Sequence, residues 1–390
     1  MATPGREGVT LGYCTNVHPG CTLDKIKDQL DRHARAVDAL VAKASGQSSN
    51  DSLPIGLWLP ASVAGPLAGD ADAISAFRDF LEARNLRVFT VNGFPFGDFH
   101  SETVKHRVYH PAWSDPARLR YTLDLARVLA GLIPEGDTAC ISTLPLGWRS
   151  SLDDGDIEVS AAALRQAARA LEKLRDDTGR VIRVALEPEP GCTLDTTEDV
   201  VAFFERYLPE ARDRAFLGVC HDVCHAAVMF EDQRSSLAAL AEAGIRVDKV
   251  QISSAIRAGL AAGNAATLHA LSAFVEPRYL HQTALGDREG RRLRLFDDLP
   301  TALEGDHSGA AELRVHFHVP VYLDAIDTLG TTRANIAPAI KAARELHGTP
   351  DFEVETYAWH VLPRHLQRGE LAAGIADELA WTARMLEGNA

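Results

Sequence analysis

The sequence lacks the features of several large classes of protein. Only six of its 390 residues are cysteines, and no two of them form a CxxC pair, so a disulfide framework is not expected. No apolar stretch approaches the roughly 18 uninterrupted residues of a membrane helix, and the opening residues MATPGREG contain no apolar signal core. We therefore expect a soluble protein of the reducing cytoplasm, with no insertion into a membrane.

Positive charge is also in short supply. The sequence has 40 Lys and Arg residues against 54 Asp and Glu, a net charge of -14. A surface that binds nucleic acid needs clustered Lys and Arg, so nucleic acid is excluded as the main partner. The hydrophobic content of 46% excludes a disordered tail. The expected partner is a small-molecule substrate, and association with a second copy or with a protein of the same pathway stays open.

One unit recurs along the chain: a short apolar run rich in β-branched residues, a loop with Pro or Gly, and a segment with helical spacing. Helix starts are marked by Thr22, by Asp115 before Pro116 and by Thr331, and Gly348 is expected to close the last of these helices. The alternation predicts parallel strands. The eight runs expected to form them are residues 9–14, 55–59, 88–91, 139–144, 182–186, 216–220, 247–252 and 352–356.

Eight such units predict an α/β protein with a (β/α)8 TIM barrel. The alternative, a doubly wound open sheet, would carry a Gly-rich phosphate turn after the first strand, where the sequence reads CTNVHPG. About 100 residues separate Ile252 from Phe352, where a barrel usually spends roughly 25 to 40. We therefore expect a single domain, residues 1–390, with an insertion at 255–325 that places a few strands over the barrel mouth. The run RVHFHVPVYL, residues 314–323, is expected to be one of those strands.

Polar side chains stand at the ends of the last four barrel strands, and the reacting groups of a barrel project from those ends. The fifth strand ends in Glu187 and Glu189, the sixth in Asp222, the seventh in Gln251 and the eighth in Glu355. So much uncompensated charge at one level of the barrel would be costly to bury. We predict that Glu187, Asp222, Gln251 and Glu355 bind a divalent cation, Mn²⁺ or Zn²⁺ first and Mg²⁺ or Co²⁺ next.

Two histidine motifs lie near this site. In one interpretation of DVCH, Asp222 binds the ion while His225 turns toward the substrate. In the alternative, Asp222 caps the next helix and the ring of His225 has its hydrogen bonds satisfied by neighbouring groups. His316 and His318 alternate in VHFHVP, so they share one face of their strand. If that face looks into the barrel mouth, one of them completes the metal shell or contacts the substrate; otherwise both pack against the rim.

The first half of the chain offers candidate walls for the substrate. Loops rich in aromatic residues, Gly and Pro at a barrel mouth often form an apolar surface for a sugar ring or carbon chain. A plain hydrophobic plug is the alternative for the aromatic members. The expected contacts at the ends of the first, third and fourth strands are His18, Asn92, Phe94, His100 and Trp148, and Glu189 after the fifth strand is a further expected substrate contact.

These motifs also carry a resemblance. The order of motifs over the last four strands resembles the xylose-isomerase-like barrel superfamily: Glu, then DxxH, then Gln or His, then Glu. This superfamily includes ketose epimerases, inositol-related isomerases and dehydratases, and endonuclease IV. The whole chain is similar to the metabolite traffic protein EboE family in the strings GYCTNVHPG, VNGFPFGDFH, ISTLPLGW, LEPEPGC, DVCHAAV, KVQISSA, RVHFHVPV and VETYAW. The EboE resemblance implies an association with gene clusters that make or move a small secondary metabolite.

The superfamily resemblance implies a divalent-metal-dependent isomerase or epimerase that acts on a small sugar, cyclitol or related polyhydroxy carbonyl compound. It implies that Glu187 and Glu355 move a proton on the carbon next to a carbonyl, that Asp222 binds the metal and that His225 faces the substrate. The chain departs from the epimerases at Gln251, where they have His, and this leaves a ligand role for His316.

Two alternatives remain. One is a metal-dependent phosphoester hydrolase, in which the cluster Arg288, Arg291, Arg292 and Arg294 faces a phosphate. The other is a protein that binds and hands over a metabolite without turning it over.

Overall fold

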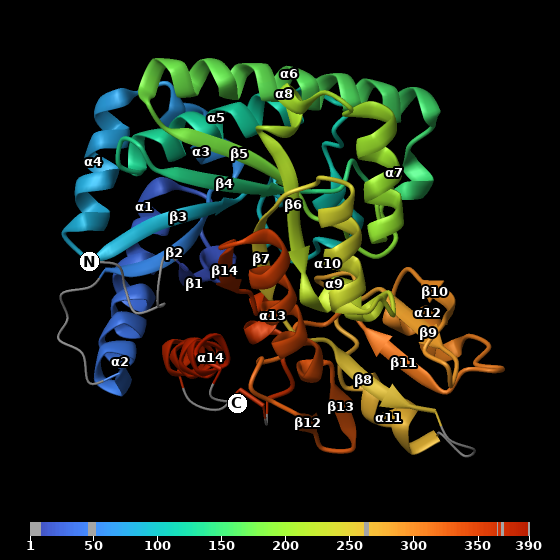
Figure 1. The fold of residues 1–390 in the computed structure, drawn as a ribbon. Coiled ribbons are helices and arrows are strands. Elements are labelled where there is room, and N and C mark those ends of the chain that lie inside the picture. The colour runs from blue at the N-terminus through green and yellow to red at the C-terminus, as the bar shows by residue number, and fades with distance from the viewer. Residues whose placement is uncertain (1–8, 46–51, 261–264, 365, 368–369, 389–390) are drawn as a thin grey trace.

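The computed structural model describes residues 9–45, 52–260, 265–364, 366–367 and 370–388. Its central feature is a closed barrel of eight parallel strands in the order β1-β14-β7-β6-β5-β4-β3-β2 (Figure 1). The predicted (β/α)8 TIM barrel is therefore confirmed, and each predicted strand overlaps an observed one. The barrel strands are β1 (Leu11–Cys14), β2 (Leu53–Trp58), β3 (Leu86–Asn92), β4 (Thr138–Thr143), β5 (Val181–Leu186), β6 (Leu217–Asp222), β7 (Val247–Ile252) and β14 (Asp351–Val354).

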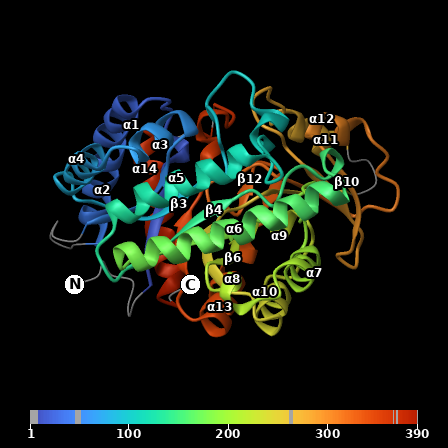
Figure 2. The ribbon, with the colours of Figure 1, turned by 90° about the horizontal axis from the view of Figure 1, so that it is seen from above.

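Helices cover the outside of the barrel, and α5 and α6 run side by side across it (Figure 2). Because helices cover the outer face and side chains fill the interior, β2, β6 and β7 are buried along their whole length. This burial explains why the strands read as continuous apolar runs. The barrel helices are α1 (Leu23–Gln29), α2 (Arg35–Ser45), α3 (Ala61–Ala68), α4 (Ala71–Glu82), α5 (Pro116–Leu132), α6 (Asp154–Thr178), α7 (Thr197–Tyr207), α8 (Ala211–Arg214), α9 (Val223–Val228), α10 (Gln233–Glu242), α13 (Ile336–His347) and α14 (Leu371–Leu386).

The predicted helix boundaries hold in most places. Thr22 caps α1 by accepting the Lys25 amide, and Asp115 caps α5 with Pro116 in its first turn. Gly348 closes α13 with a φ of 78°, in the left-handed region that favours glycine. The prediction at Thr331 is wrong, because a 3-10 turn over Arg333–Asn335 precedes α13. Every helix in the described part of the chain is too short or too polar to cross a bilayer.

The interior of the barrel contains a buried ion pair. Lys249 on β7 donates from Nζ to Glu353 Oε2 on β14 at 2.7 Å and to Ser142 Oγ on β4 at 3.0 Å. Both charged side chains are fully buried. Alternate residues of a strand face the same side, so Gln251 and Glu355 follow Lys249 and Glu353 toward the carboxyl end of the barrel.

Between β7 and β14 the chain forms a second sheet, of antiparallel pairs in the order β10-β9-β11-β8-β13-β12. Figure 1 shows it in yellow to orange, to one side of the barrel. Two helices, α11 (Ala265–Ser272) and α12 (Leu299–Glu304), accompany it. Its strands are β8 (Ile256–Gly259), β9 (Thr283–Gly286), β10 (Arg292–Phe296), β11 (Glu312–Val315), β12 (Ala325–Ile326) and β13 (Leu329–Thr331).

The predicted strand over residues 314–323 is wrong beyond its first two residues, because β11 ends at Val315. The Phe317 amide donates to the Val315 carbonyl at 2.8 Å, and this tight turn takes the backbone out of the ladder. Further on, Pro320 has no amide hydrogen to donate. His316 and His318 therefore lie beyond the strand, yet their Nε2 atoms still lie 3.2 Å apart.

Candidate metal centre at the carboxyl ends of the barrel strands

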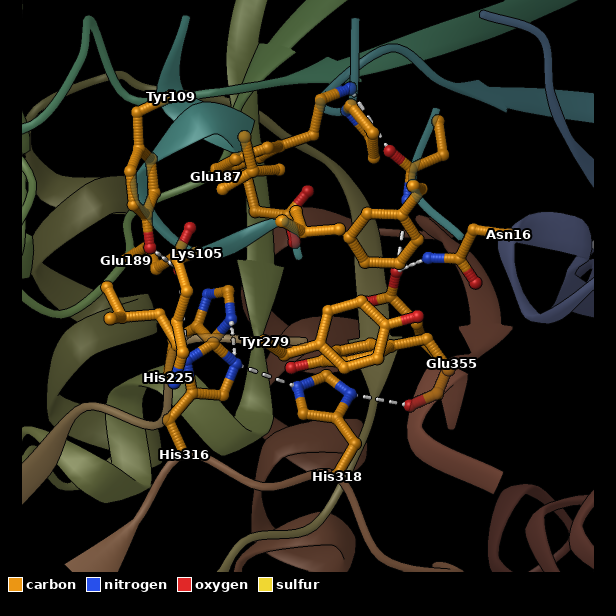
Figure 3. A pocket seen from close by; sticks show the side chains of 18 residues that line it. Asn16, Lys105, Tyr109, Glu187, Glu189, His225, Tyr279, His316, His318 and Glu355 are labelled. Carbon is orange, nitrogen blue, oxygen red and sulfur yellow. Dashed lines mark hydrogen bonds and ion pairs between the residues drawn. The ribbon is translucent and has the colours of Figure 1, made fainter. Parts of the chain in front are cut away.

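A pocket with an empty volume of about 530 Å³ opens at the carboxyl ends of the barrel strands (Figure 3). Both the barrel and the segment between β7 and β14 contribute to its walls. The polar residues that line it are Asn16, Asn92, Lys105, Tyr109, Glu187, Glu189, His225, Tyr279, His316, His318, Glu355 and Tyr357.

Three carboxylates from distant parts of the sequence meet at this pocket. Glu187 follows β5, Asp222 ends β6 and Glu355 follows β14, and one oxygen of each lies within 4.8 Å of the others. Their exposed fractions are 3%, 2% and 5%. Within the described residues no Lys or Arg forms an ion pair with any of them. Carboxylates this close and this buried repel one another unless protons or a cation lie between them.

The donor atoms at this position fit a cation. Glu187 Oε2 and Asp222 Oδ2 are buried and have no hydrogen-bond partner, and the same holds for both amide atoms of Gln251 on β7. A buried oxygen left without a partner costs about 1–3 kcal/mol. Carboxylate and amide oxygens are ligands of hard and borderline divalent ions. The residues present therefore suit the ion that the strand-end pattern predicts.

Neighbouring side chains hold two of the carboxylates in place. Glu355 Oε1 accepts hydrogen bonds from Asn16 Nδ2 at 2.6 Å and from Asn92 Nδ2 at 3.0 Å. Asp222 Oδ1 accepts from the His225 amide at 2.9 Å and from Ser253 Oγ at 2.7 Å. Asp222 is thus the N-cap of α9, as one interpretation of DVCH predicts. Its second oxygen has no hydrogen-bond partner and remains available to bind a cation, as the other interpretation predicts.

Burial dominates the electrostatics of these groups. It raises the pKa of Glu187 to about 7, and it raises the pKa of Glu355 well above the ordinary range, with repulsion from Glu187 and Asp222 adding to the effect. Burial acts in the same direction on Asp222, but the charges of His225 and His318 outweigh it and lower the pKa of that carboxyl. A cation that binds here would displace protons, so its affinity rises with pH.

The histidines of the two predicted motifs come together in one wall of the pocket (Figure 3). Nε2 of His316 lies 3.1 Å from Nε2 of His225 and 3.2 Å from Nε2 of His318. Burial lowers the pKa of His316 well below its ordinary value and that of His318 to about 4.

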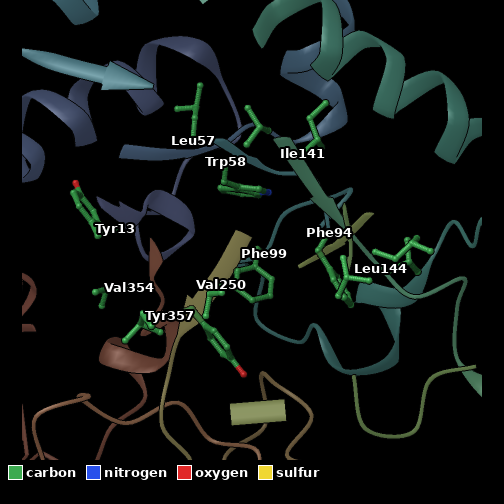
Figure 4. Close-up of a cluster of buried hydrophobic side chains, with 14 of the residues drawn as sticks. Tyr13, Leu57, Trp58, Phe94, Phe99, Ile141, Leu144, Val250, Val354 and Tyr357 are labelled. Carbon is green, nitrogen blue, oxygen red and sulfur yellow. The ribbon is translucent and has the colours of Figure 1, made fainter. Parts of the chain in front are cut away.

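Aromatic rings form another wall. Phe94 lines the pocket, and Phe99, Tyr279 and Tyr357 pack against one another with ring centroids 4.9 to 5.4 Å apart. Figure 4 shows Phe94, Phe99 and Tyr357 among the buried side chains at this end of the barrel. Asn92 and Glu189 also line the pocket as the sequence predicts, and Glu189 Oε1 accepts a hydrogen bond from Tyr109 at 2.7 Å.

Three predicted substrate contacts lie outside the lining residues. His18 Nε2 lies 3.1 Å from the Tyr13 hydroxyl, His100 Nε2 lies 2.7 Å from the Asn16 carbonyl oxygen, and the Trp148 ring packs on Tyr109 with centroids 4.9 Å apart. None of them lines the pocket, although His100 and Trp148 contact the lining residues Asn16 and Tyr109.

The arginine cluster 288–294 also lies away from the pocket lining. Arg291 pairs with Asp287 at 2.7 Å, Arg294 lies 3.5 Å from Asp306, and Arg292 Nη1 lies 3.0 Å from the sulfur of Met229. These contacts give the cluster a local structural role at the edge of the second sheet.

Several residues of the site were not predicted from the sequence. Lys249 and Glu353 could have been found, because KVQ and EVE place polar residues at alternate positions of otherwise apolar strands. Asn16, Tyr109 and Gln282 gave no such signal, since they lie in short 3-10 helices or just before β9 and reach the site only through the tertiary fold.

No protein-family model matches the chain, and its sequence matches no protein of curated function. Solved structures do match it over nearly its whole length. A xylose isomerase-like TIM-barrel protein from Mycobacterium smegmatis, in complex with magnesium, is 12% identical with a TM-score of 0.54, and the alignment covers 98% of both chains. The structure of L-ribulose 3-epimerase is 12% identical with a TM-score of 0.50, covering 98% of this chain and 95% of that one. The IOLI protein with a bound zinc atom is 11% identical with a TM-score of 0.50, covering 97% and 98%. The chain thus has the xylose isomerase-like TIM-barrel fold.

Proposed function

We propose that this protein is a divalent-metal-dependent isomerase or epimerase that acts on a small sugar, cyclitol or related polyhydroxy carbonyl metabolite. One observation carries the proposal: the buried carboxylates Glu187, Asp222 and Glu355 converge at the bottom of the barrel mouth, where Glu187 and Glu355 line the pocket, and two of the three present an oxygen without a partner. Structural neighbours that hold magnesium or zinc, or that epimerise a sugar, support it. In this proposal residues 255–325 are an insertion over the mouth of one domain, residues 1–390, because Tyr279 and His316 line the pocket.

Glu187, Asp222 and Glu355 would hold the ion, with Gln251 as a further oxygen donor from β7. When bound, the cation supplies Lewis acidity toward the carbonyl and hydroxyl oxygens of the substrate. His316 lies with the other two histidines and not among these carboxylates, so it is not needed in this shell.

The proton transfer falls to the two glutamates. Both carboxylates line the pocket, and a carboxyl group positioned beside the reacting carbon acts as general base or general acid. In the proposal one glutamate removes the proton from the carbon next to the carbonyl and the other returns one. The aromatic wall of Phe94 and Tyr357 excludes water from that carbon.

The test measures exchange of carbon-bound hydrogen. The full-length protein, loaded with Mn²⁺, is incubated with a panel of ketoses and inososes in deuterated water, and NMR follows deuterium at the position next to the carbonyl. Exchange is expected with the wild type, and its rate should fall at least about 100-fold in Glu187→Gln and in Glu355→Gln.

Glu312→Gln serves as the matched control, because this partly buried carboxylate pairs with Arg257 and Arg314 in the second sheet and does not line the pocket. It should exchange at the wild-type rate. An active Glu187→Gln/Glu355→Gln variant would overturn the proposed chemistry. A ligand that binds only with metal and returns without deuterium would instead support a protein that hands over a metabolite.

A further inference from the structure

Three buried imidazoles meet beside the carboxylates, and Nε2 of His316 is in contact with Nε2 of both His225 and His318. His225 lies in α9, and His316 and His318 lie after β11, so the three come from two distant parts of the chain. The two closest Nε2 pairs are 3.1 and 3.2 Å apart. We call these three residues the histidine triad.

Hydrogen bonds fix the protonation of two of the rings. Nδ1 of His225 lies 2.8 Å from the Pro188 carbonyl oxygen, and Nδ1 of His318 lies 2.7 Å from the Glu355 carbonyl oxygen. A backbone carbonyl only accepts, so in both rings Nδ1 carries the hydrogen. When such a ring is neutral, its Nε2 atom carries no hydrogen and presents a lone pair.

The third ring is fixed by a glutamine. Nδ1 of His316 lies 2.7 Å from Gln282 Oε1. The amide cannot be turned over, because Gln282 Nε2 donates to the Tyr109 hydroxyl, to Glu189 Oε1 and to the Pro190 carbonyl. His316 therefore also carries its hydrogen on Nδ1, so its Nε2 lone pair faces Nε2 of His225 and Nε2 of His318.

Protons alone do not satisfy this arrangement. If His225 were protonated, it would donate from Nε2 to His316, but the contact between His316 and His318 would remain one lone pair against another. A proton on His318 as well would place two imidazolium ions around one neutral ring in a buried site. A metal ion resolves both contacts, because two nitrogens bound at 2.0–2.1 Å in a tetrahedral site lie ~3.3 Å apart.

We propose that the histidine triad binds a second divalent ion of the zinc class, next to the ion held by the carboxylates. Three imidazoles suit Zn²⁺ better than Mg²⁺ or Mn²⁺, and they leave one tetrahedral position for water or a substrate oxygen. The unpaired Asp222 Oδ2 lies 3.9 Å from His225 Nε2, between the two sites. In this proposal His225 and His318 bind a metal ion instead of the substrate. The proposal does not depend on whether the pocket performs an isomerisation.

The test counts ions and identifies their ligands. The full-length protein is stripped of metal and titrated with Zn²⁺ or Co²⁺, with stoichiometry from elemental analysis and the nitrogen-rich site followed by the visible absorption of Co²⁺. The wild type should take up two ions. His316→Asn and His318→Asn keep an amide N–H where Nδ1 lies and remove Nε2, so each should lose one ion and the strong visible band, with affinity falling more than about 100-fold.

His281→Asn is the matched control. His281 is buried and its ring stacks on Phe317, but its two nitrogens contact the His316 carbonyl and Glu276, outside the triad. This variant should keep both ions. X-ray absorption of the zinc-loaded wild type gives a readout without any variant, and it should show imidazole nitrogens at about 2.0 Å.

A variant of the carboxylate site separates the two proposals. Glu187→Gln/Glu355→Gln should lose the carboxylate-bound ion and keep the triad ion with its absorption band. Unchanged stoichiometry and spectrum in His316→Asn and His318→Asn, or zinc without imidazole ligands in the wild type, would overturn the second site. Loss of all metal in both kinds of variant would show one mixed site and would also overturn it.

Discussion

Replacement of Lys249 tests the electrostatics of the barrel interior. Lys249→Met keeps the length of the side chain and removes its charge, which leaves the buried Glu353 carboxylate without the ion pair at 2.7 Å. Removing one member of a buried pair typically costs 3–5 kcal/mol, because the other charge stays in a medium of low dielectric. The unpaired Glu353 carboxylate avoids this cost if it takes up a proton and becomes neutral.

The free energy of this protonation sets the size of the stability loss. A glutamic acid with an ordinary pKa of about 4.3 costs 1.36 kcal/mol per pH unit to protonate, or ~3–4 kcal/mol at pH 7 and ~1 kcal/mol at pH 5. With an unfolding entropy of ~2.1 cal/mol/K per residue, 390 residues give ~0.8 kcal/mol/K. We therefore expect Lys249→Met to melt ~4–5 °C below the wild type at pH 7 and ~1 °C below it at pH 5.

Differential scanning calorimetry at the two pH values measures both differences. Lys249→Met/Glu353→Gln should recover most of the loss at pH 7, since it removes both charges. Lys173→Met is the control: its pair with Asp177 is exposed, so the change should stay within about 1 kcal/mol. A Tm difference that is equal at pH 5 and pH 7, or a double variant less stable than the single one, would refute the reasoning.

Three further predictions concern the metal and a second buried carboxyl. Asn16→Ala should weaken divalent metal binding about 10- to 100-fold in isothermal titration calorimetry, because Asn16 holds Glu355 in place, and an unchanged affinity would count against this role. Removal of metal by a chelator should lower the Tm, since an ion at 1,000 times its Kd adds about 4 kcal/mol to the free energy of unfolding, whereas an unchanged Tm would contradict the site. Burial raises the pKa of Glu378 from 4.5 to about 7, so the stability present below pH 4.5 is lost as pH rises toward 7. Glu378→Gln lacks this loss, and urea unfolding should show the wild type gaining ~3 kcal/mol on the variant between pH 7.5 and pH 4.5; a constant difference would contradict it.

The barrel could be predicted because most residues of its strands are buried, whichever face they point to, so that the strands read as apolar runs. Strand ends also located the carboxylates, since the carboxyl ends of parallel strands meet at one end of a barrel. Glu187, Asp222 and Glu355 lie together for this reason, although long stretches of sequence separate them.

The second sheet could be predicted only in part. Alternation of His316 and His318 indicated a shared direction, which the structure has, but the strand itself ends at Val315 because of the turn at Phe317. Nothing local in the sequence shows that Gln282 would fix the tautomer of His316, since that contact joins the residue before β9 to the residue after β11 through the tertiary fold.

The charges at the barrel mouth can be balanced in two ways. Lys249 is already paired with Glu353, and Lys105 with Asp298, so among the described lining residues no free Lys or Arg remains for the carboxylates. Protons could neutralise Glu187 and Glu355, but they would leave the lone pairs of the histidine triad facing one another. Two divalent ions satisfy both halves at once: one takes the place of the carboxyl protons and the other fills the space among the imidazoles. The two proposals together make the carboxylates and the histidine triad neighbouring parts of one metal-binding surface, and Asp222 lies within reach of ligand atoms of both groups.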